Sequence, residues 1–200
     1  GHLIKDYFAN FCLYNGNLTV DTGNNSIEFH NKERENWKIK LIDTGEKTLT
    51  GGRLARVKEY LSDEPFCMTY GDGLGNVDIR KLIEFHLKKK KLATLTAVQP
   101  PGRYGAIDIS GEKIISFQEK KRDQSSWING GFFVLDPEVI DLINGDDCMW
   151  EDQPLKLLAS NNELNAFKHF GFWHPMDTLK DRISLEKRWE NNNAPWKIWE

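Results

Sequence analysis

The stretch that decides the fold is Phe66–Asp78, which reads Phe-Cys-Met-Thr-Tyr-Gly-Asp-Gly-Leu-Gly-Asn-Val-Asp. Its first five residues form a mostly apolar run between Pro65 and Gly71. That pattern predicts a strand buried on both faces. Three glycines at alternate positions then loosen the backbone, and Asp78–Lys89 has helical spacing. Because ligands of open α/β sheets bind beyond the carboxyl ends of the strands, we expect Asp72 to project into a binding crevice.

A carboxylate framed by glycines has a definite chemistry. The glycines let phosphate groups approach the backbone, and Asp72 offers the oxygen ligands that Mg²⁺ prefers. The same three letters, Gly-Asp-Gly, are also common in ordinary turns, where the aspartate only caps the backbone. On the local sequence alone, both interpretations stay open.

Composition narrows the class of protein. The 200 residues carry 27 Lys and Arg against 30 Asp and Glu, a net charge of −3, so the chain does not favour nucleic acid as a partner. No apolar run approaches the length of a membrane span, so we expect no membrane partner and a soluble, cytoplasmic protein. The cysteines, which are widely spaced, are expected to be reduced core thiols: Cys12, Cys67 and Cys148.

The order of the predicted elements indicates an α/β fold. Strand Phe66–Tyr70, helix Asp78–Lys89 and strand Leu92–Val98 predict a parallel connection. Alternating residues at Tyr104–Ile109 and Lys113–Gln118 predict a hairpin. Other predicted helices are Gly1–Tyr14, Gly51–Leu61, Pro137–Ile143, Trp150–Ser160 and Thr178–Trp189. Other predicted strands are Leu18–Val20, Ser26–His30, Lys38–Asp43, Ile128–Leu135 and Asn165–Phe170.

Eight short motifs follow one another along the chain: Asp43-Thr-Gly, Thr50-Gly-Gly-Arg-Leu, Thr69-Tyr-Gly-Asp-Gly, Pro101-Gly-Arg-Tyr-Gly-Ala, Ser116-Phe-Gln-Glu-Lys, Ile128-Asn-Gly-Gly-Phe-Phe, Gly171-Phe-Trp and Pro175-Met-Asp-Thr. Each is weak alone, but their shared order resembles the sugar-1-phosphate nucleotidylyltransferases over the whole chain. The resemblance implies a Rossmann-like α/β fold with a mixed, mainly parallel sheet flanked by helices and a small β-hairpin subregion. It also implies a single domain over residues 1–200.

The resemblance is strongest to family members that use CTP. It implies transfer of a cytidylyl group from CTP to α-D-glucose 1-phosphate, which gives CDP-glucose and pyrophosphate for deoxyhexose and surface polysaccharide synthesis. It implies Mg²⁺ as the cofactor, CTP and glucose 1-phosphate as partners, and a homo-oligomer.

The resemblance also assigns roles to single residues. Asp72 and Asp177 correspond to the two carboxylates that hold Mg²⁺, and Lys120 corresponds to the lysine that binds the sugar phosphate. These three residues form the implied catalytic set. In the resemblance, Thr48 and Arg53 contact the edge of the pyrimidine base, and Glu119 and Asn129 hydrogen-bond the sugar hydroxyls. Gly105 gives the substrate access to the backbone, and Gly71 and Gly130 are further substrate-binding residues.

The sequence departs from the family pattern at two places. Family members begin with a strand and a Gly-Gly-x-Gly-Thr-Arg loop around the nucleotide phosphates, followed by a Lys-Pro-Lys segment. Residues 1–200 contain neither motif. We therefore expect a domain that lacks its N-terminal strand and phosphate loop, with weak or no turnover by this chain alone. The family sequence Glu-Lys-Pro is also replaced by Glu119-Lys120-Lys121.

Alternative interpretations remain for several of these residues. Asp177 could simply be the N-cap of the helix that follows it. Asn129, Gly130 and Gly131 could form a β-bulge. At the level of function, the alternatives are a nucleotide-sugar-dependent glycosyltransferase and a non-catalytic fragment that binds sugar phosphates.

Overall fold

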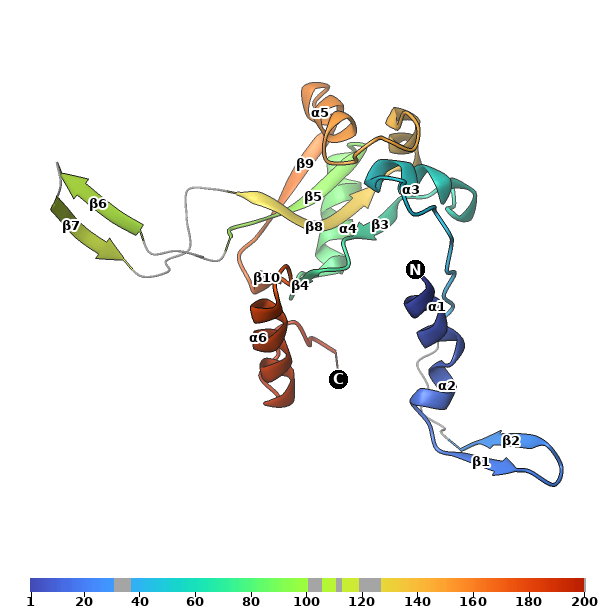
Figure 1. Ribbon diagram of the computed structural model, residues 1–200. Helices are drawn as coiled ribbons and strands as arrows, with labels where there is room; N and C mark the ends of the chain where they lie inside the picture. Colours follow the sequence, from blue (N-terminus) through green and yellow to red (C-terminus); the bar gives the residue numbers. More distant parts are fainter. Residues whose placement is uncertain (31–36, 101–105, 111–112, 119–126, 200) are drawn as a thin grey trace. The chain divides into compact units, whose positions relative to one another are not determined.

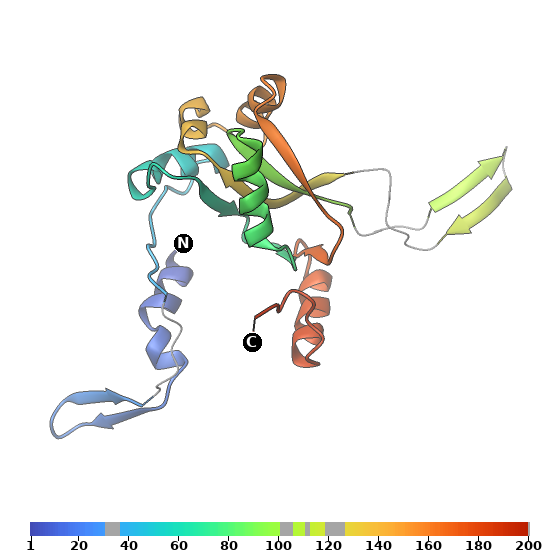
Figure 2. The same ribbon diagram turned by 180° about the vertical axis from the view of Figure 1, so that it is seen from behind.

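The structure is a computed structural model that describes residues 1–30, 37–100, 106–110, 113–118 and 127–199. It divides into two compact units, Gly1–Glu46 and Lys47–Glu200, and each is described by itself. Figures 1 and 2 show the ribbon from opposite sides. No helix among the described residues is both long and apolar enough to span a membrane.

The first unit consists of helices and a hairpin. Helices α1 (His2–Ala9) and α2 (Phe11–Tyr14) replace the single helix predicted for this region, with a break at Asn10. The two predicted strands of this region are confirmed as β1 (Leu18–Asp21) and β2 (Ser26–Phe29), which pair antiparallel. The turn between them is closed by side-chain and backbone hydrogen bonds, because the Asp21 carboxylate accepts from two backbone N–H groups.

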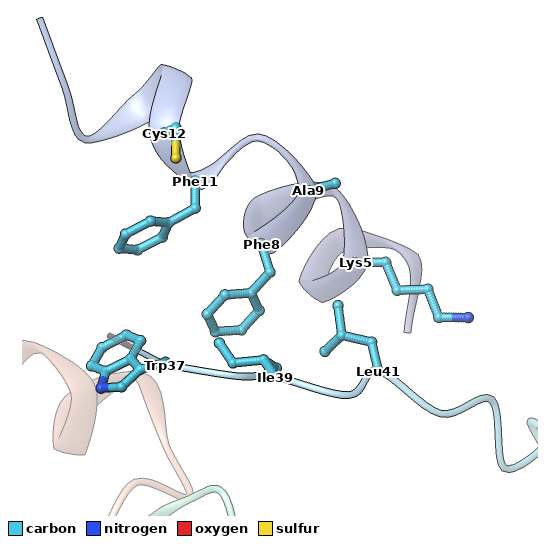
Figure 3. Close-up of a pocket in the computed structure, with 8 residues that line it drawn as sticks. All are labelled: Lys5, Phe8, Ala9, Phe11, Cys12, Trp37, Ile39 and Leu41. Atoms are coloured by element: carbon cyan, nitrogen blue, oxygen red, sulfur yellow. The ribbon is translucent and has the colours of Figure 1, made fainter. Parts of the chain in front are cut away.

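The predicted strand Lys38–Asp43 is wrong, because these residues form no strand. A strand needs ladder hydrogen bonds to a neighbouring strand, and this segment belongs to none of the ladders among the described residues. Its apolar side chains instead face the helices: the Trp37 ring lies 6.1 Å from that of Phe11. Figure 3 shows Ile39 turned toward the Phe8 ring.

A four-stranded sheet forms the centre of the second unit. Its order is β3 (Phe66–Thr69), β8 (Ile128–Leu135), β5 (Ala93–Val98) and β9 (Leu164–His169). Strand β8 is antiparallel to both β3 and β5, whereas β9 is parallel to β5. Three strands therefore run in one direction with β8 reversed between two of them. This arrangement confirms the predicted mixed α/β class.

Helices cover both faces of this sheet. They are α3 (Thr50–Arg56), the 3-10 turns η1 (Lys58–Tyr60) and η2 (Pro137–Leu142), α4 (Ile79–Lys89) and α5 (Gln153–Ser160). Helix α6 (Leu179–Glu190) lies away from this sheet and follows β10 (Figure 1). Phe133 of β8 packs in a buried cluster with Leu54 of α3 and Leu158 of α5. The next residue, Val134, points to the other face and packs with Leu82 of α4. Figure 2 brings α4 to the front of the sheet.

Two smaller ladders complete the second unit. Strand β4 (Gly73–Gly75) directly follows Asp72 and pairs antiparallel with β10 (Trp173–Pro175), which ends two residues before Asp177. Strands β6 (Ala106–Ser110) and β7 (Lys113–Gln118) form the predicted hairpin.

Strand β3 is not buried on both faces, so that prediction is wrong. Phe66 and Met68 pack against the main core, but Cys67 and Thr69 between them are exposed. The physical reason is position, because β3 is an edge strand of the four-stranded ladder in the described chain. The expectation that all cysteines lie in the core fails with it, since only Cys148 is buried.

Candidate active site at the carboxyl end of β3

The two predicted metal ligands lie on neighbouring segments of backbone. Asp72 follows β3 in a turn, and the pairing of Gly73 with Pro175 brings the end of β10 beside it. The backbone N–H of Met176 donates to the carbonyl of Asp72 at 2.7 Å. Asp177 comes next in the chain, and both aspartates are exposed. Residues far apart in the sequence are therefore brought together by the β4–β10 ladder.

The interpretation of Asp177 as a helix cap is wrong. The N-cap of α6 is Thr178, whose hydroxyl accepts from the backbone N–H of Asp181 at 3.2 Å. The Asp181 carboxylate in turn accepts from the backbone N–H of Thr178 at 3.0 Å, which completes a capping box. Asp177 lies one residue outside the helix, directly before this anchored cap.

Strand β10 is held from two sides. The Trp173 indole donates to the carbonyl of Gly130 in β8 at 2.8 Å, which ties the small ladder to the main sheet. Trp196, near the end of the chain, is buried with its ring 5.5 Å from that of Phe172. These contacts fix the strand that leads to Asp177.

Asn129 lies at a bulge near the start of β8. The register shifts between Leu95 and Ala97 of β5, so the bulge suggested by the sequence is confirmed. The Asn129 side-chain oxygen accepts from the backbone N–H of Gly131 at 2.8 Å. Its amide nitrogen donates to the hydroxyl of Tyr70 at 3.4 Å. The amide is therefore held at both of its ends.

Tyr70 is half-buried beside the Asn129 amide. Burial raises the pKa of Tyr70 well above its usual range, and the negative charge of Glu151 raises it further. Glu151 also accepts from the Thr50 hydroxyl at 2.6 Å. We call the two hydrogen-bonded pairs, Thr50 with Glu151 and Asn129 with Tyr70, the Tyr70 network.

The predicted base-reading residues belong to the segment that Thr50 begins. Thr48 is buried two residues before Thr50, whereas Arg53 is exposed on α3. The helix packs closely on the chain before Glu151, because a Cβ atom at Gly52 would lie 2.6 Å from the carbonyl of Asp146. The glycine pair in the Thr50-Gly-Gly-Arg-Leu motif thus permits a backbone contact.

The remaining predicted site residues differ in whether the structure describes them and in how exposed they are. Gly105, Glu119 and Lys120 lie outside the described residues. Gly71 is exposed with open space around it, whereas Gly130 is buried against β5.

Sequence reasoning missed three residues that the fold brings into the site. Tyr70 and Thr50 stand inside quoted motifs, which was the available signal, although no role was given to them. Glu151 carried no local signal and is identified by the hydrogen bond that it accepts from Thr50 and by its effect on the pKa of Tyr70.

The first unit contains a cavity of about 600 Å³ that does not fit this chemistry. Its lining is apolar apart from one lysine and one thiol: Lys5, Phe8, Ala9, Phe11, Cys12, Trp37, Ile39 and Leu41. Figure 3 shows the Lys5 ammonium group pointing away from the rings. Phosphates need donors aimed at them, so this cavity is not a candidate nucleotide site.

A metal site built only from protein side chains is not found in the described part of the chain. No three His, Cys, Asp or Glu residues gather there in an arrangement that could hold an ion. Two carboxylates can hold Mg²⁺ when water and substrate phosphates supply the other ligands. The chemistry of the donors at Asp72 and Asp177 is compatible with such an ion.

Comparison with known proteins gives the same fold and points to the same chemistry. Residues 17–175 match the nucleotidyl transferase family. The chain is similar to glucose-1-phosphate cytidylyltransferase of Salmonella typhi, with 52% identity over all of this chain and 78% of that enzyme. It is 38% identical to a probable glucose-1-phosphate cytidylyltransferase of Bacillus subtilis, again over all of this chain and 78% of the relative.

Solved structures extend the likeness to the fold. HddC from Yersinia pseudotuberculosis superposes with a TM-score of 0.58 and 23% identity, covering 78% of this chain and 68% of HddC. A UDP-glucose pyrophosphorylase crystallised with UDP-glucose has a TM-score of 0.56 and 13% identity, covering 76% of this chain and 65% of that one. These likenesses confirm the predicted Rossmann-like mixed α/β fold.

Proposed function

Because the chain belongs to the nucleotidyl transferase family, we propose that it transfers a cytidylyl group from CTP to α-D-glucose 1-phosphate. The products are CDP-glucose and pyrophosphate. The observation that carries this proposal is the 52% identity to the Salmonella typhi cytidylyltransferase over the full length of this chain. CTP is made inside cells, so we place the reaction in the cytoplasm.

The reaction joins two phosphates that repel each other. A phosphate oxygen of glucose 1-phosphate attacks the α-phosphorus of CTP, and the bond from that phosphorus to the leaving pyrophosphate breaks. Mg²⁺ would be held by Asp72 and Asp177 and would neutralise charge between the two phosphates. The support for this pair is the ladder that brings the end of β10 beside Asp72.

The other assigned residues orient the substrates around that point. Lys120 binds the sugar phosphate as a point charge, and Glu119 with Asn129 hydrogen-bonds the sugar hydroxyls. Thr48 and Arg53 bind the cytosine edge, since a guanidinium offers paired donors to its O2 and N3 acceptors. The glycines at positions 71, 105 and 130 leave room for the substrates to contact the backbone.

The test is pyrophosphate release by the purified protein with CTP and glucose 1-phosphate, with CDP-glucose identified by mass spectrometry. UTP, GTP and mannose 1-phosphate serve as matched competitors. We expect product with Mg²⁺ and none after its removal by a chelator. Substrate binding without pyrophosphate release would favour a non-catalytic protein. Transfer of glucose from CDP-glucose to an acceptor would favour a glycosyltransferase.

A further inference from the structure

We propose that His174 is a positioning residue, which closes the turn that carries Asp177 by holding the backbone at the start of that turn and facing the helix cap at its end. His174 lies on β10, three residues before Asp177. The metal-binding role of Asp177 rests on the proposed function. The closed turn rests on contacts of the structure.

The start of the turn is fixed through one peptide group, the one that joins Pro175 to Met176. The Nδ1 atom of His174 lies 2.7 Å from the carbonyl oxygen of Pro175. A carbonyl oxygen only accepts, so Nδ1 carries the hydrogen and donates it. The N–H of the same peptide group, on Met176, donates to the carbonyl of Asp72 at 2.7 Å. Both polar groups of this peptide are therefore held directly before Asp177.

The end of the turn is fixed by Asp181, whose two carboxylate oxygens have separate tasks. Oδ2 accepts from the backbone N–H of Thr178 at 3.0 Å and from its hydroxyl at 2.7 Å. Oδ1 lies 3.9 Å from Nε2 of His174, where an ion pair forms whenever the ring carries a second hydrogen. The residue that completes the cap of α6 thus also faces the ring that holds the start of the turn.

The surroundings of the ring separate its packing from its hydrogen bond. The His174 ring stacks on that of Phe172, with centroids 6.5 Å apart and planes at 19°. The side chains of His174 and Asp181 are only 27% and 20% exposed, so water replaces a lost contact in part. The stack keeps the ring in place but supplies no hydrogen bond, so a substitution can remove the ring or the donor alone.

The consequence concerns the order of the turn before any ion binds. Asp177 is exposed and lies between the held peptide group and the cap of α6. A carboxylate on an open turn loses conformational freedom when it takes up an ion, whereas a turn that is already closed avoids most of that cost. His174 should therefore raise the affinity for an ion at Asp72 and Asp177 without contacting a substrate.

The experiment compares His174→Phe with His174→Asn. Phe keeps the ring against Phe172 but has no donor, and His174→Leu is the second variant without a donor. Asn has no ring but places an amide N–H close to the position of Nδ1. Asp181→Asn keeps an oxygen for the cap and removes the charge that faces His174. The control is His30→Ala, which removes an exposed imidazole 2.7 Å from the Thr19 hydroxyl in the first unit.

Two measurements report on the turn. The first is backbone hydrogen exchange over residues 174–181 without ligands. His174→Phe should speed exchange of the Met176 N–H about fivefold, because the peptide group loses one of its two hydrogen bonds. The second is the Kd for Mn²⁺, measured by electron paramagnetic resonance with CTP present. Mn²⁺ takes the same oxygen ligands as Mg²⁺, and its Kd should rise about tenfold in His174→Phe.

The other variants define the cause of these changes. His174→Asn and His30→Ala should stay within about twofold of the unaltered protein in both measurements, because each leaves a donor at Pro175. Asp181→Asn should speed exchange about twofold, and adding it to His174→Phe should change nothing further, since both changes open the same closure.

Several results would overturn the proposal. They are unchanged exchange in His174→Phe and His174→Leu, faster exchange in His174→Asn, additive effects in the double variant, or faster exchange with an unchanged Kd for Mn²⁺. The exchange measurement needs neither substrate nor metal. If the unaltered protein forms no CDP-glucose, the proposed function fails, while the exchange result still decides whether His174 closes the turn.

Discussion

Two groups of side chains lie at the carboxyl end of β3, and they are held in different ways. Asp72 and Asp177 are exposed, and backbone hydrogen bonds of the β4–β10 ladder set their positions. In the Tyr70 network only Thr50 is exposed, and each pair is held by a side-chain hydrogen bond, Thr50 to Glu151 and Asn129 to Tyr70.

The difference suggests separate tasks for the two groups, catalysis for the exposed carboxylates and support of the site for the more buried side chains. Exposed carboxylates remain open to an ion and to phosphates, and their replacement leaves the backbone ladder intact. A half-buried network carries a stability cost when one partner is removed, because the remaining groups lose hydrogen bonds away from water. Changes at the carboxylate pair should therefore alter turnover, and changes beside the network should alter stability or substrate affinity.

The largest effect is expected from Asp72→Asn and Asp177→Asn. Each should lower kcat at least ~10²-fold, since charge stabilisation during phosphoryl transfer is lost. The thermal midpoint should stay unchanged. Steady-state pyrophosphate release and a melting curve measure both, with exposed Asp63→Asn as the control. Retention of normal turnover by either variant would contradict the shared metal site.

Gly130→Ala should show the opposite pattern, which is a loss of protein stability. A Cβ atom at Gly130 would lie 2.8 Å from a methyl carbon of Val98 and 2.9 Å from the carbonyl of Thr96. Overpacking of this kind costs about 1–3 kcal/mol in the free energy of unfolding. Chemical denaturation measures the change. Gly71→Ala is the control, because nothing lies within 4 Å of its Cβ position. Equal stability of the two variants would refute the argument.

Arg53→Ala tests the residue that we propose binds the cytosine base. The loss of paired donors to cytosine should raise KM for CTP about tenfold, while KM for glucose 1-phosphate changes less than about twofold. Initial rates measured with each substrate varied in turn test this. A comparable loss for both substrates would argue against a role in reading the base.

Thr178→Ala should have the smallest effect. It removes the N-cap of α6 and should lower the free energy of unfolding by about 1 kcal/mol. The Mg²⁺ concentration needed for the half-maximal rate should rise modestly. Thr178→Ser keeps the hydroxyl and should restore both values. If Ser fails to rescue the metal requirement, the cap does not position Asp177.

The sequence by itself determined several local elements and supplied the candidate site as a prediction. Apolar runs, glycine turns and capping residues predicted β3, α4 and β8 close to their observed bounds. The strand-end pattern identified Asp72, and the order of the motifs added Asp177 and Asn129. These signals are local, because a strand, a turn or a helix start is encoded within a few neighbouring residues.

Only the tertiary structure decided which segments meet. It placed β8 in reverse between β3 and β5, put Lys38–Asp43 outside the ladders that the described residues form, and moved the cap of α6 from Asp177 to Thr178. It also brought Glu151 to Thr50. Pairing between distant segments depends on the packing of the whole core and on which hydrogen-bonding groups remain to be satisfied, and no local pattern of residues records that.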